Sequence, residues 1–281
     1  MLTFDEIFKI INELKFNLSR GTQTYKLLEK LAKESARDSG FATSGLDSLG
    51  DFGSIHLPFL KMGNINTLDL FGLDELILFA WYKKNRNLYK NVADLGANVG
   101  LHSILMSKLG WVVDAYEADP ETAAILKNNL KLNASDTVSV HNQACSSSDG
   151  NANFVRVENN LTGSHLEGAK ENPYGELKTF EVATIGIERI MAKCDFFKMD
   201  VEGSEAEIIK ATTAPNWYAV DAVIEIGSLA NSKIIFEHFN HIGVAMYSQK
   251  NAWKLVTKSE ELPMHHSEGS VFCSTRRNFL Q

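Results

Sequence analysis

The chain has 281 residues, 44% of them hydrophobic, so it can bury a full core as one large domain or as a domain with an extension. Its net charge of −7 excludes the basic footprint of a nucleic-acid-binding protein, and no apolar run approaches the ~20 residues of a membrane span. The N-terminus lacks the basic start and apolar core of a secretory signal, and the three cysteines contain no Cys-x-x-Cys pair. We therefore expect a cytoplasmic protein that binds no nucleic acid and has no membrane span.

Apolar residues recur at three- and four-residue steps in the first forty residues, which predicts two short amphipathic helices. The two stripes contain Phe4, Ile7, Phe8, Ile11 and Leu14, then Leu27, Leu28 and Leu31. Such helices cannot bury themselves, so we expect them to pack on the rest of the chain, or on a second copy in a homodimer. We place a helical extension at 1–52 and a main domain at 53–281.

The next segments are a loop, a hairpin and a helix. Glycine, serine and aspartate over 40–53 predict the loop, and short apolar segments with Pro58, Gly63 and Asn64 over 55–70 predict a β-hairpin. The pattern turns helical over 73–82, and from residue 91 strands and helices alternate. This alternation predicts an α/β fold with a doubly wound, mostly parallel, Rossmann-like sheet over 91–281. The expected strands are 91–95, 112–116, 137–142, 195–199 and 221–226, and the expected helices are 100–109, 120–132, 203–211 and 230–240.

A polar stretch over 159–178 separates strand-like segments at 153–158 and 178–183. An excursion of this length suits a lid that faces the substrate. The tail predicts further strands at 244–248, 253–257 and 270–275.

The segment Asn91-Val-Ala-Asp-Leu-Gly-Ala-Asn-Val-Gly100 is the most informative feature of the chain. An apolar strand ends near Asp94, turns through Gly96, Asn98 and Gly100, and enters a helix, which is the usual cradle for a nucleotide-like cofactor. About 20 residues on, a second strand ends in Glu117, an acid suited to ribose hydroxyls. The turn lacks the middle glycine of a dinucleotide fingerprint and follows an acid. These details favour S-adenosylmethionine, with its amine and sulfonium, over NAD.

A second acidic cluster follows the expected strand at 195–199. Asp200 and Glu202 come directly after it, and Glu225 ends the next strand of the sheet. Because ligands bind at the carboxyl ends of strands in open α/β sheets, these acids should face the same crevice. Glu205, which enters a helix, is better explained as a partner of the helix dipole.

These motifs resemble the FkbM family of S-adenosylmethionine-dependent methyltransferases over roughly residues 90–275. The resemblance rests on Val92–Ser103, on Tyr116-Glu-Ala-Asp-Pro120, and above all on Lys198, Asp200, Glu202, Gly203 and Glu205 of the family's Lys-x-Asp-x-Glu-Gly-x-Glu block. It implies that the chain binds S-adenosylmethionine and methylates an acceptor. One departure is Thr184-Ile-Gly186, because the family commonly has an aspartate in place of this glycine.

The resemblance implies a division of the site between cofactor and acceptor. We assign cofactor binding to Asp94, Gly96, Asn98, Gly100, Glu117, Ala118 and Asn142, with Glu117 on the ribose. We assign catalysis to Asp200 or Glu202 as the base for a hydroxyl acceptor and to Glu225 as an orienting acid. The expected acceptor is a small molecule, a sugar or glycan, or a lipid-linked group.

Several alternatives stay open at this stage. The three catalytic acids could instead hold a divalent cation, although we assign no metal ligand. His102, after the glycine turn, and His165, in the polar stretch, are weaker candidates for the site. The competing functions are an NAD-dependent oxidoreductase and a cofactor-binding protein without turnover.

Overall fold

The computed structural model describes residues 2–38, 49–63, 65–160, 162–170 and 175–280. Its centre is an eight-stranded sheet in the order β11-β10-β12-β9-β8-β1-β2-β3. Five neighbouring strands are parallel, and β12 is antiparallel to both β9 and β10. The predicted doubly wound, mostly parallel sheet is confirmed. The strands are β1 (Asn91–Leu95), β2 (Val112–Tyr116), β3 (Val138–His141), β8 (Phe196–Met199), β9 (Asp221–Glu225), β10 (Ala245–Ser248), β11 (Lys254–Leu255) and β12 (Ser270–Ser274).

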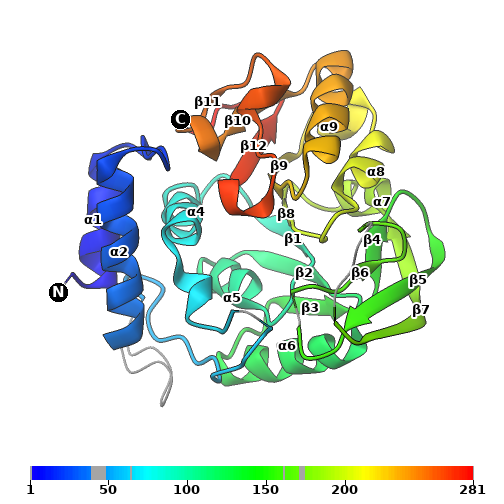
Figure 1. Ribbon diagram of the computed structural model, residues 1–281, viewed down its shortest axis with the longest axis horizontal. Coiled ribbons are helices and arrows are strands. Elements are labelled where there is room, and N and C mark those ends of the chain that lie inside the picture. Colours follow the sequence, from blue (N-terminus) through cyan, green and yellow to red (C-terminus); the bar gives the residue numbers. More distant parts are fainter. Residues whose placement is uncertain (1, 39–48, 64, 161, 171–174, 281) are drawn as a thin grey trace.

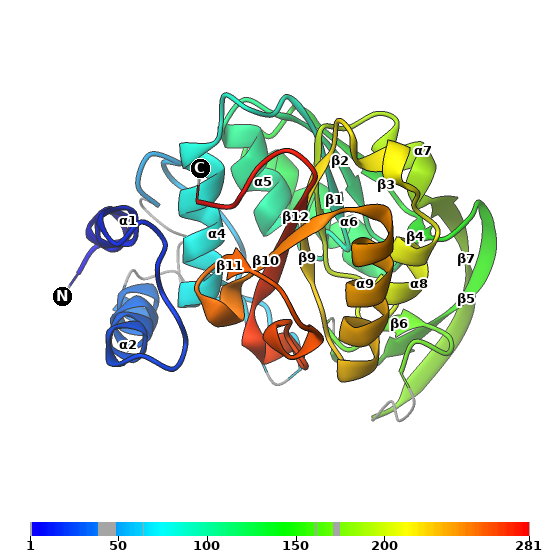
Figure 2. The same ribbon diagram turned by 90° about the horizontal axis from the view of Figure 1, so that it is seen from above.

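Helices cover both faces of this sheet (Figures 1 and 2). One face carries α4 (Leu73–Lys84), α5 (Leu101–Lys108) and α6 (Pro120–Leu132), whose apolar side chains share a core with Val92 and Phe196. The other face carries α7 (Ile187–Met191), α8 (Glu205–Lys210) and α9 (Leu229–Ile242). Each strand sends alternate side chains to the two faces, so both cores draw on the same strands. Short 3-10 helices occur at Asp69–Phe71, Ala214–Trp217, Gln249–Asn251, Ser259–Glu261 and His266–Glu268.

The first two helices, α1 (Phe4–Glu13) and α2 (Gln23–Asp38), lie beside α4 at one end of the molecule (Figure 1). Thr3 and Glu6 form a capping box that begins α1. Buried apolar side chains of both helices join the core of α4, and Arg20 pairs with Asp74 on that helix. The expected packing on the same chain is therefore present.

A second, four-stranded sheet lies at the opposite end of the molecule, in the order β4-β7-β5-β6. It consists of β4 (Ala144–Ser146), β5 (Gly150–Val157), β6 (His165–Leu166) and β7 (Leu177–Gly186). The two strand-like segments that flank the polar stretch are the antiparallel pair β5 and β7. Residues 161 and 171–174 of that stretch lie outside the described residues.

The predicted β-hairpin over 55–70 is reduced to a short antiparallel pairing, in which the amide of Thr67 donates to the carbonyl of Leu60 and the amide of Met62 to that of Ile65. Within the described part of this segment, Lys61 and Asn66 form a single antiparallel bridge, and the chain then turns into a 3-10 helix. Its apolar side chains Ile55 and Leu57 are buried in the core that α4 shares, so tertiary packing accounts for their apolar character. Residues 40–48 of the predicted loop, and Asn64, are not among the described residues.

Candidate functional site

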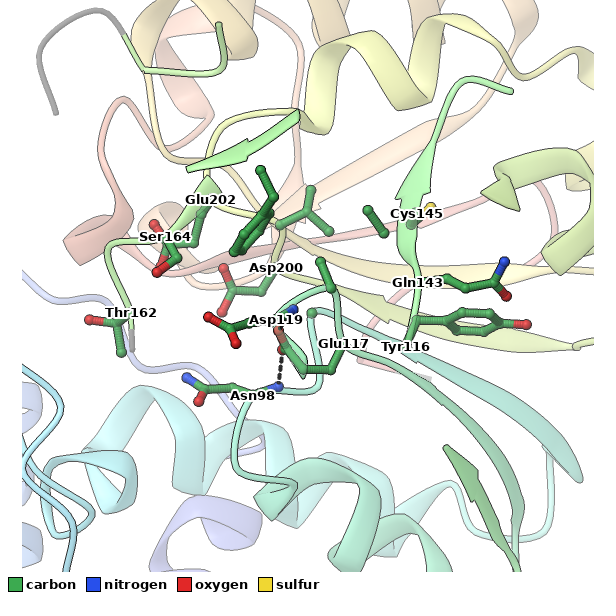
Figure 3. Close-up of a pocket in the computed structure, with 15 residues that line it drawn as sticks. Asn98, Tyr116, Glu117, Asp119, Gln143, Cys145, Thr162, Ser164, Asp200 and Glu202 are labelled. Carbon is green, nitrogen blue, oxygen red and sulfur yellow. Dashed lines mark hydrogen bonds between the residues drawn. The ribbon is translucent and has the colours of Figure 1, made fainter. Parts of the chain in front are cut away.

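A pocket opens at the point where the strand order of the sheet reverses. From β1 the chain passes to β2 and β3 on one side and later to β8 and β9 on the other. This switch point, at the carboxyl ends of the strands, is where open α/β sheets bind ligands. Figure 3 shows the pocket and the polar side chains on its walls. Its lining consists of Gly96, Asn98, Tyr116, Glu117, Ala118, Asp119, Gln143, Ala144, Cys145, Phe154, Thr162, Ser164, Asp200, Val201 and Glu202.

The glycine turn joins the two halves of the sheet at this point. Gly96 has a φ of +75°, and a Cβ there would lie 1.8 Å from the carbonyl oxygen of Asp200. The amide of Asp200 donates to the carbonyl of Leu95 at 2.9 Å, and the amide of Gly96 donates to the carbonyl of Tyr116 at 3.0 Å. Only glycine permits this close approach of the β1 and β8 backbones.

Glu117 is the acid at the end of β2, and it is 8% exposed. Its Oε2 accepts the amide of Asn98 at 2.9 Å, and its Oε1 accepts the amide of Asp119 at 2.9 Å (Figure 3). Burial raises the pKa of Glu117 to about 7, and these two amide donors oppose the rise. The carboxylate is fixed at the pocket wall and retains lone pairs for hydroxyl donors.

Four of the seven residues assigned to the cofactor line the pocket, namely Gly96, Asn98, Glu117 and Ala118. The other three lie behind the wall. Asp94 is fully buried and accepts Ser103 Oγ at 2.6 Å, while its Oδ1 has no hydrogen-bond partner among the described residues. A Cβ at Gly100 would meet Leu126 Cδ1 at 2.3 Å, so this glycine serves helix packing. Asn142 donates to the carbonyls of Glu117 and Ala118 and so supports the wall from outside.

Asp119 and Arg156 form a buried ion pair that the sequence analysis did not single out. Arg156 Nε and Nη2 each donate to the Asp119 carboxylate at 2.6 Å, and both side chains are less than a tenth exposed. Asp119 also caps α6 through the amides of Glu121 and Thr122. The pair ties β5 of the second sheet to the loop that carries Glu117. An acid before Pro120 was visible in the sequence, but nothing linked it to an arginine 37 positions later.

The three acids assigned to catalysis do not all reach this pocket. Asp200 and Glu202 line it, and Glu225 does not. Asp200 Oδ2 lies 3.4 Å from the ammonium of Lys198, which is 7% exposed. Burial, with the neighbouring Asp200 charge, raises the pKa of Glu202 to about 7, and Lys170 at 2.7 Å opposes this rise. Burial and the same Asp200 charge raise the pKa of Glu225 well above its ordinary value.

Two other expectations concern residues near the pocket. Glu205 accepts the amide of Gly203 at 2.9 Å and a hydrogen bond from Asn231, which agrees with a structural role at the start of α8. His165, considered as a base, is buried away from the pocket lining and its Nδ1 lies 2.9 Å from the carbonyl of Gly163.

Gly186, the departure from the family pattern, lies outside the pocket lining. It precedes α7 at the N-cap position, where its amide donates to Asp149 at 2.9 Å. The position at which the family has an aspartate is therefore at the start of a helix and not in the pocket lining.

Pocket residues that sequence reasoning missed come largely from the second sheet and the polar stretch. Gln143, Ala144 and Cys145 follow β3, Phe154 lies on β5, and Thr162 and Ser164 come from the polar stretch. Only the position of the polar stretch beside the site was foreseen. Across the ranges that the structure describes, no three His, Cys, Asp or Glu side chains converge as a metal site requires. No helix in those ranges has the length and apolar character needed to cross a bilayer.

Several solved structures are similar to this chain at low sequence identity. No curated protein sequence matches the chain. A precorrin-6y C5,15-methyltransferase from Geobacter metallireducens is similar in structure, with 14% identity, a TM-score of 0.36, and coverage of 70% of this chain and 85% of that one. A methyltransferase from Agrobacterium tumefaciens, described as SAM-dependent, has 10% identity, a TM-score of 0.38, and coverage of 72% and 61%. An O-methyltransferase from Bacillus cereus in complex with SAH has 11% identity, a TM-score of 0.38, and coverage of 70% and 76%.

The family assignment comes from the sequence. The model of the methyltransferase FkbM domain matches residues 94–247, more than half of the 281 residues. This range begins at Asp94 of the glycine turn, includes the pocket residues from Gly96 to Glu202, and ends in β10. The chain belongs to the FkbM methyltransferase domain family.

Proposed function

We propose that the protein transfers a methyl group from S-adenosylmethionine to a hydroxyl of a small molecule, a sugar or glycan, or a lipid-linked acceptor. The observation that carries this proposal is the contact of Gly96 with the Asp200 carbonyl beside the buried carboxylate of Glu117. It brings the backbones after β1 and β8 together beside an acid that can accept two ribose hydroxyls.

The residues present fit this cofactor. Glu117 would accept the ribose hydroxyls, and Asn98 would line the same wall. Asp94 is fully buried behind the turn, and its Oδ1 has no hydrogen-bond partner in the part of the chain that the structure describes, which favours a ligand that carries an amine and a sulfonium. Because Glu117, Asp119 and Asp200 all line the pocket, the pyrophosphate of NAD would meet several acids there, which disfavours the oxidoreductase alternative.

The bound cofactor would supply an electrophilic methyl group on sulfur, and the protein would hold the acceptor in line with it. We assign Asp200 the role of taking the hydroxyl proton. It lines the pocket, and it directly follows β8, the strand that pairs with β1. Glu225, whose pKa is raised well above its ordinary value by burial and the Asp200 charge, would orient the acceptor as a hydrogen-bond donor in its protonated form. Glu202 is held by Lys170 and would fix the polar stretch over the pocket.

Two measurements test this proposal. Equilibrium dialysis with S-adenosylmethionine and with NAD should show binding of the former alone. A screen of sugars, nucleotide sugars and lipid headgroups, with mass detection, should then find a product heavier by one methyl group. Binding of NAD alone would support the oxidoreductase, and cofactor binding without a methylated product would support a protein without turnover. Activity that a chelator leaves unchanged would exclude a divalent cation.

We also propose a domain division, a homodimer and a cytoplasmic location for this protein. The division into a helical extension at 1–52 and a methyltransferase domain at 53–281 predicts that a chain beginning at residue 53 keeps cofactor binding. A homodimer through α1 and α2 predicts that light scattering gives a dimer for the full chain and a monomer for this shorter chain. Cell fractionation tests the cytoplasmic location.

A further inference from the structure

A group of polar residues lies at the carboxyl edge of the sheet, on the face covered by α4 and α5. Val92, Phe196 and Val223 belong to the core on this face, so Asp94, Lys198 and Glu225, two residues further along each strand, point to the same side. Asp94 and Lys198 are direct register partners. This side adjoins the cofactor pocket through Asp200, which lines that pocket and lies 3.4 Å from Lys198.

The helices over this edge contribute Glu75, His102 and Tyr82. His102 Nε2 lies 3.0 Å from Glu75 Oε2, and its Nδ1 lies 3.0 Å from the hydroxyl of Tyr82. The Phe79 ring packs edge-on against the imidazole at 5.3 Å, so the ring is held on three sides. Tyr82 is fully buried and its pKa is raised well above its ordinary value by burial, so it stays a hydrogen-bond donor. The contact of Nε2 with a carboxylate favours the tautomer that carries the proton on Nε2 and accepts the Tyr82 hydroxyl at Nδ1.

The contacts from Tyr82 to His102 and from His102 to Glu75, called the Tyr82–His102–Glu75 relay below, favour the ionised form of Glu75. Burial acts to raise the pKa of Glu75, but His102 and Lys198 together lower it below its ordinary value. The side chain of Glu75 is nevertheless 29% exposed, and that of Asp200 is 32% exposed, so each acid retains accessible surface. Lys198 interacts electrostatically with Glu75, Asp200 and Glu225. The edge therefore has the carboxylate of Glu75 and the ammonium of Lys198. The carboxylate can accept a hydrogen bond from a hydroxyl of a ligand, and the ammonium can donate one to it.

We propose that Glu75 accepts a hydrogen bond from the methyl acceptor, and that His102 and Tyr82 are positioning residues that aim it. This inference rests on the proposed methyl transfer and places the acceptor under α4, across Asp200 from the cofactor. Apart from its contact with His102, Glu75 Oε2 itself is a buried carboxylate oxygen without a hydrogen-bond partner among the described residues. A polar oxygen left without a partner at this place points to a ligand.

The test compares Glu75→Gln with Glu237→Gln, which removes an exposed carboxylate from α9. The acceptor is the compound that the wild-type protein methylates in the screen above. Loss of one charge-assisted hydrogen bond should raise the KM for that acceptor by roughly 10- to 100-fold in Glu75→Gln. The affinity for S-adenosylhomocysteine, measured by calorimetry, should change less than about twofold because Glu75 is absent from the cofactor pocket lining.

A second pair of variants separates two roles of His102, the hydrogen-bond donor that orients Glu75 and the ring that packs in the core. His102→Phe keeps an aromatic ring but removes the donor, and it should raise the acceptor KM about 10-fold with little change in kcat. His102→Gln supplies a new N–H donor and should recover part of this loss. His241→Phe, at an exposed position of α9, is the control.

A third readout needs no acceptor. Nitrogen-15 NMR of the wild-type protein should show His102 protonated on Nε2 and unprotonated on Nδ1, and Tyr82→Phe should alter that balance. The opposite tautomer would overturn the relay. Equal acceptor KM values in wild type and Glu75→Gln would overturn the contact alone, whereas the absence of any methylated product with the wild-type protein would overturn the proposed transfer and the contact with it.

Discussion

Gly96 lies directly against the carbonyl oxygen of Asp200, and this contact brings the turn after β1 and the acidic segment after β8 together. Gly96→Ala would add a Cβ 1.8 Å from that oxygen at a φ of +75°. Left-handed strain costs about 1–2 kcal/mol and overpacking about 1–3 kcal/mol, so we expect a loss of about 2–5 kcal/mol of unfolding free energy. Cofactor binding should be abolished, and urea unfolding with calorimetry checks both effects.

The matched control for Gly96 is Gly110→Ala. Gly110 has a similar φ of +89°, but nothing lies within 4 Å of the added carbon. This variant should lose only about 1–2 kcal/mol, through backbone strain, and should bind the cofactor normally. Similar losses in both variants would show that the contact with Asp200 is unimportant.

Asp200→Asn should separate chemistry from cofactor binding. The amide keeps the shape of the side chain beside Lys198 but cannot take a proton from the acceptor. We expect turnover to fall by roughly 10²–10⁴-fold, the usual contribution of a positioned base. The affinity for S-adenosylhomocysteine, measured by calorimetry, should change little. Normal turnover in this variant would remove the assignment of Asp200 as base.

The main sheet was predictable because its strands are short apolar runs that end in polar residues. Strands 91–95 and 112–116 were predicted with the observed bounds, since glycine or acid marks where each ends. The second sheet was not predictable as a unit, because β4 has three residues and β6 two, too few for a period-2 pattern. The hairpin over 55–70 is reduced to a single bridge, because its apolar side chains Ile55 and Leu57 join the core that α4 shares.

The candidate site was predictable where its residues directly follow a strand of the main sheet. Gly96, Asn98 and Glu117 follow single strands, so spacing along the sequence places them. Arg156 and Glu75 could not be found in this way, because each reaches the site from a separate element. Their positions depend on how β5 packs against α6 and α4 against α5, which the local pattern does not encode.

Arg156→Met should destabilise the protein strongly. The guanidinium neutralises Asp119 inside the fold, and it also lies 4.9 Å from the Phe180 ring. Removing one partner of a buried pair leaves the other charge uncompensated, at a cost of about 3–5 kcal/mol. Urea unfolding measures this cost. The double variant Arg156→Met with Asp119→Asn should recover part of the loss, and a double variant as unstable as the single one would contradict this account.

Lys170→Met tests whether the polar stretch holds the cofactor. Lys170 binds Glu202, and both side chains are about a third exposed, so solvent screens the pair. An exposed pair contributes about 0.2–1 kcal/mol, so S-adenosylhomocysteine should dissociate up to about fivefold faster, as measured by stopped flow. Lys178→Met, at an exposed position of β7, is the control. An unchanged dissociation rate in Lys170→Met would show that this ion pair does not retain the cofactor.

Glu117 should make cofactor binding depend on pH. Its pKa in the folded protein is about 7, and ribose hydroxyls bind best to the ionised carboxylate. Below pH 7 the ligand must displace a proton, so affinity should weaken by up to about tenfold per pH unit as the pH falls, and it should level off above pH 7. Glu117→Gln should bind weakly at every pH, without this dependence. Glu202→Gln, which removes the other carboxyl with a pKa near 7 in the pocket, should retain it.

The same carboxyl should also affect stability, with a sign that follows from proton linkage. The folded protein holds the Glu117 proton more tightly than the unfolded chain, whose carboxyl has its ordinary value near 4.5. Its contribution to stability is therefore greatest below that value and declines as the pH rises to about 7. Without ligand, the wild-type Tm should fall more between pH 5 and pH 8 than the Tm of Glu117→Gln. Parallel pH profiles for the two proteins would mean that Glu117 is already ionised throughout this range, and the pH dependence expected for cofactor binding would then be absent as well.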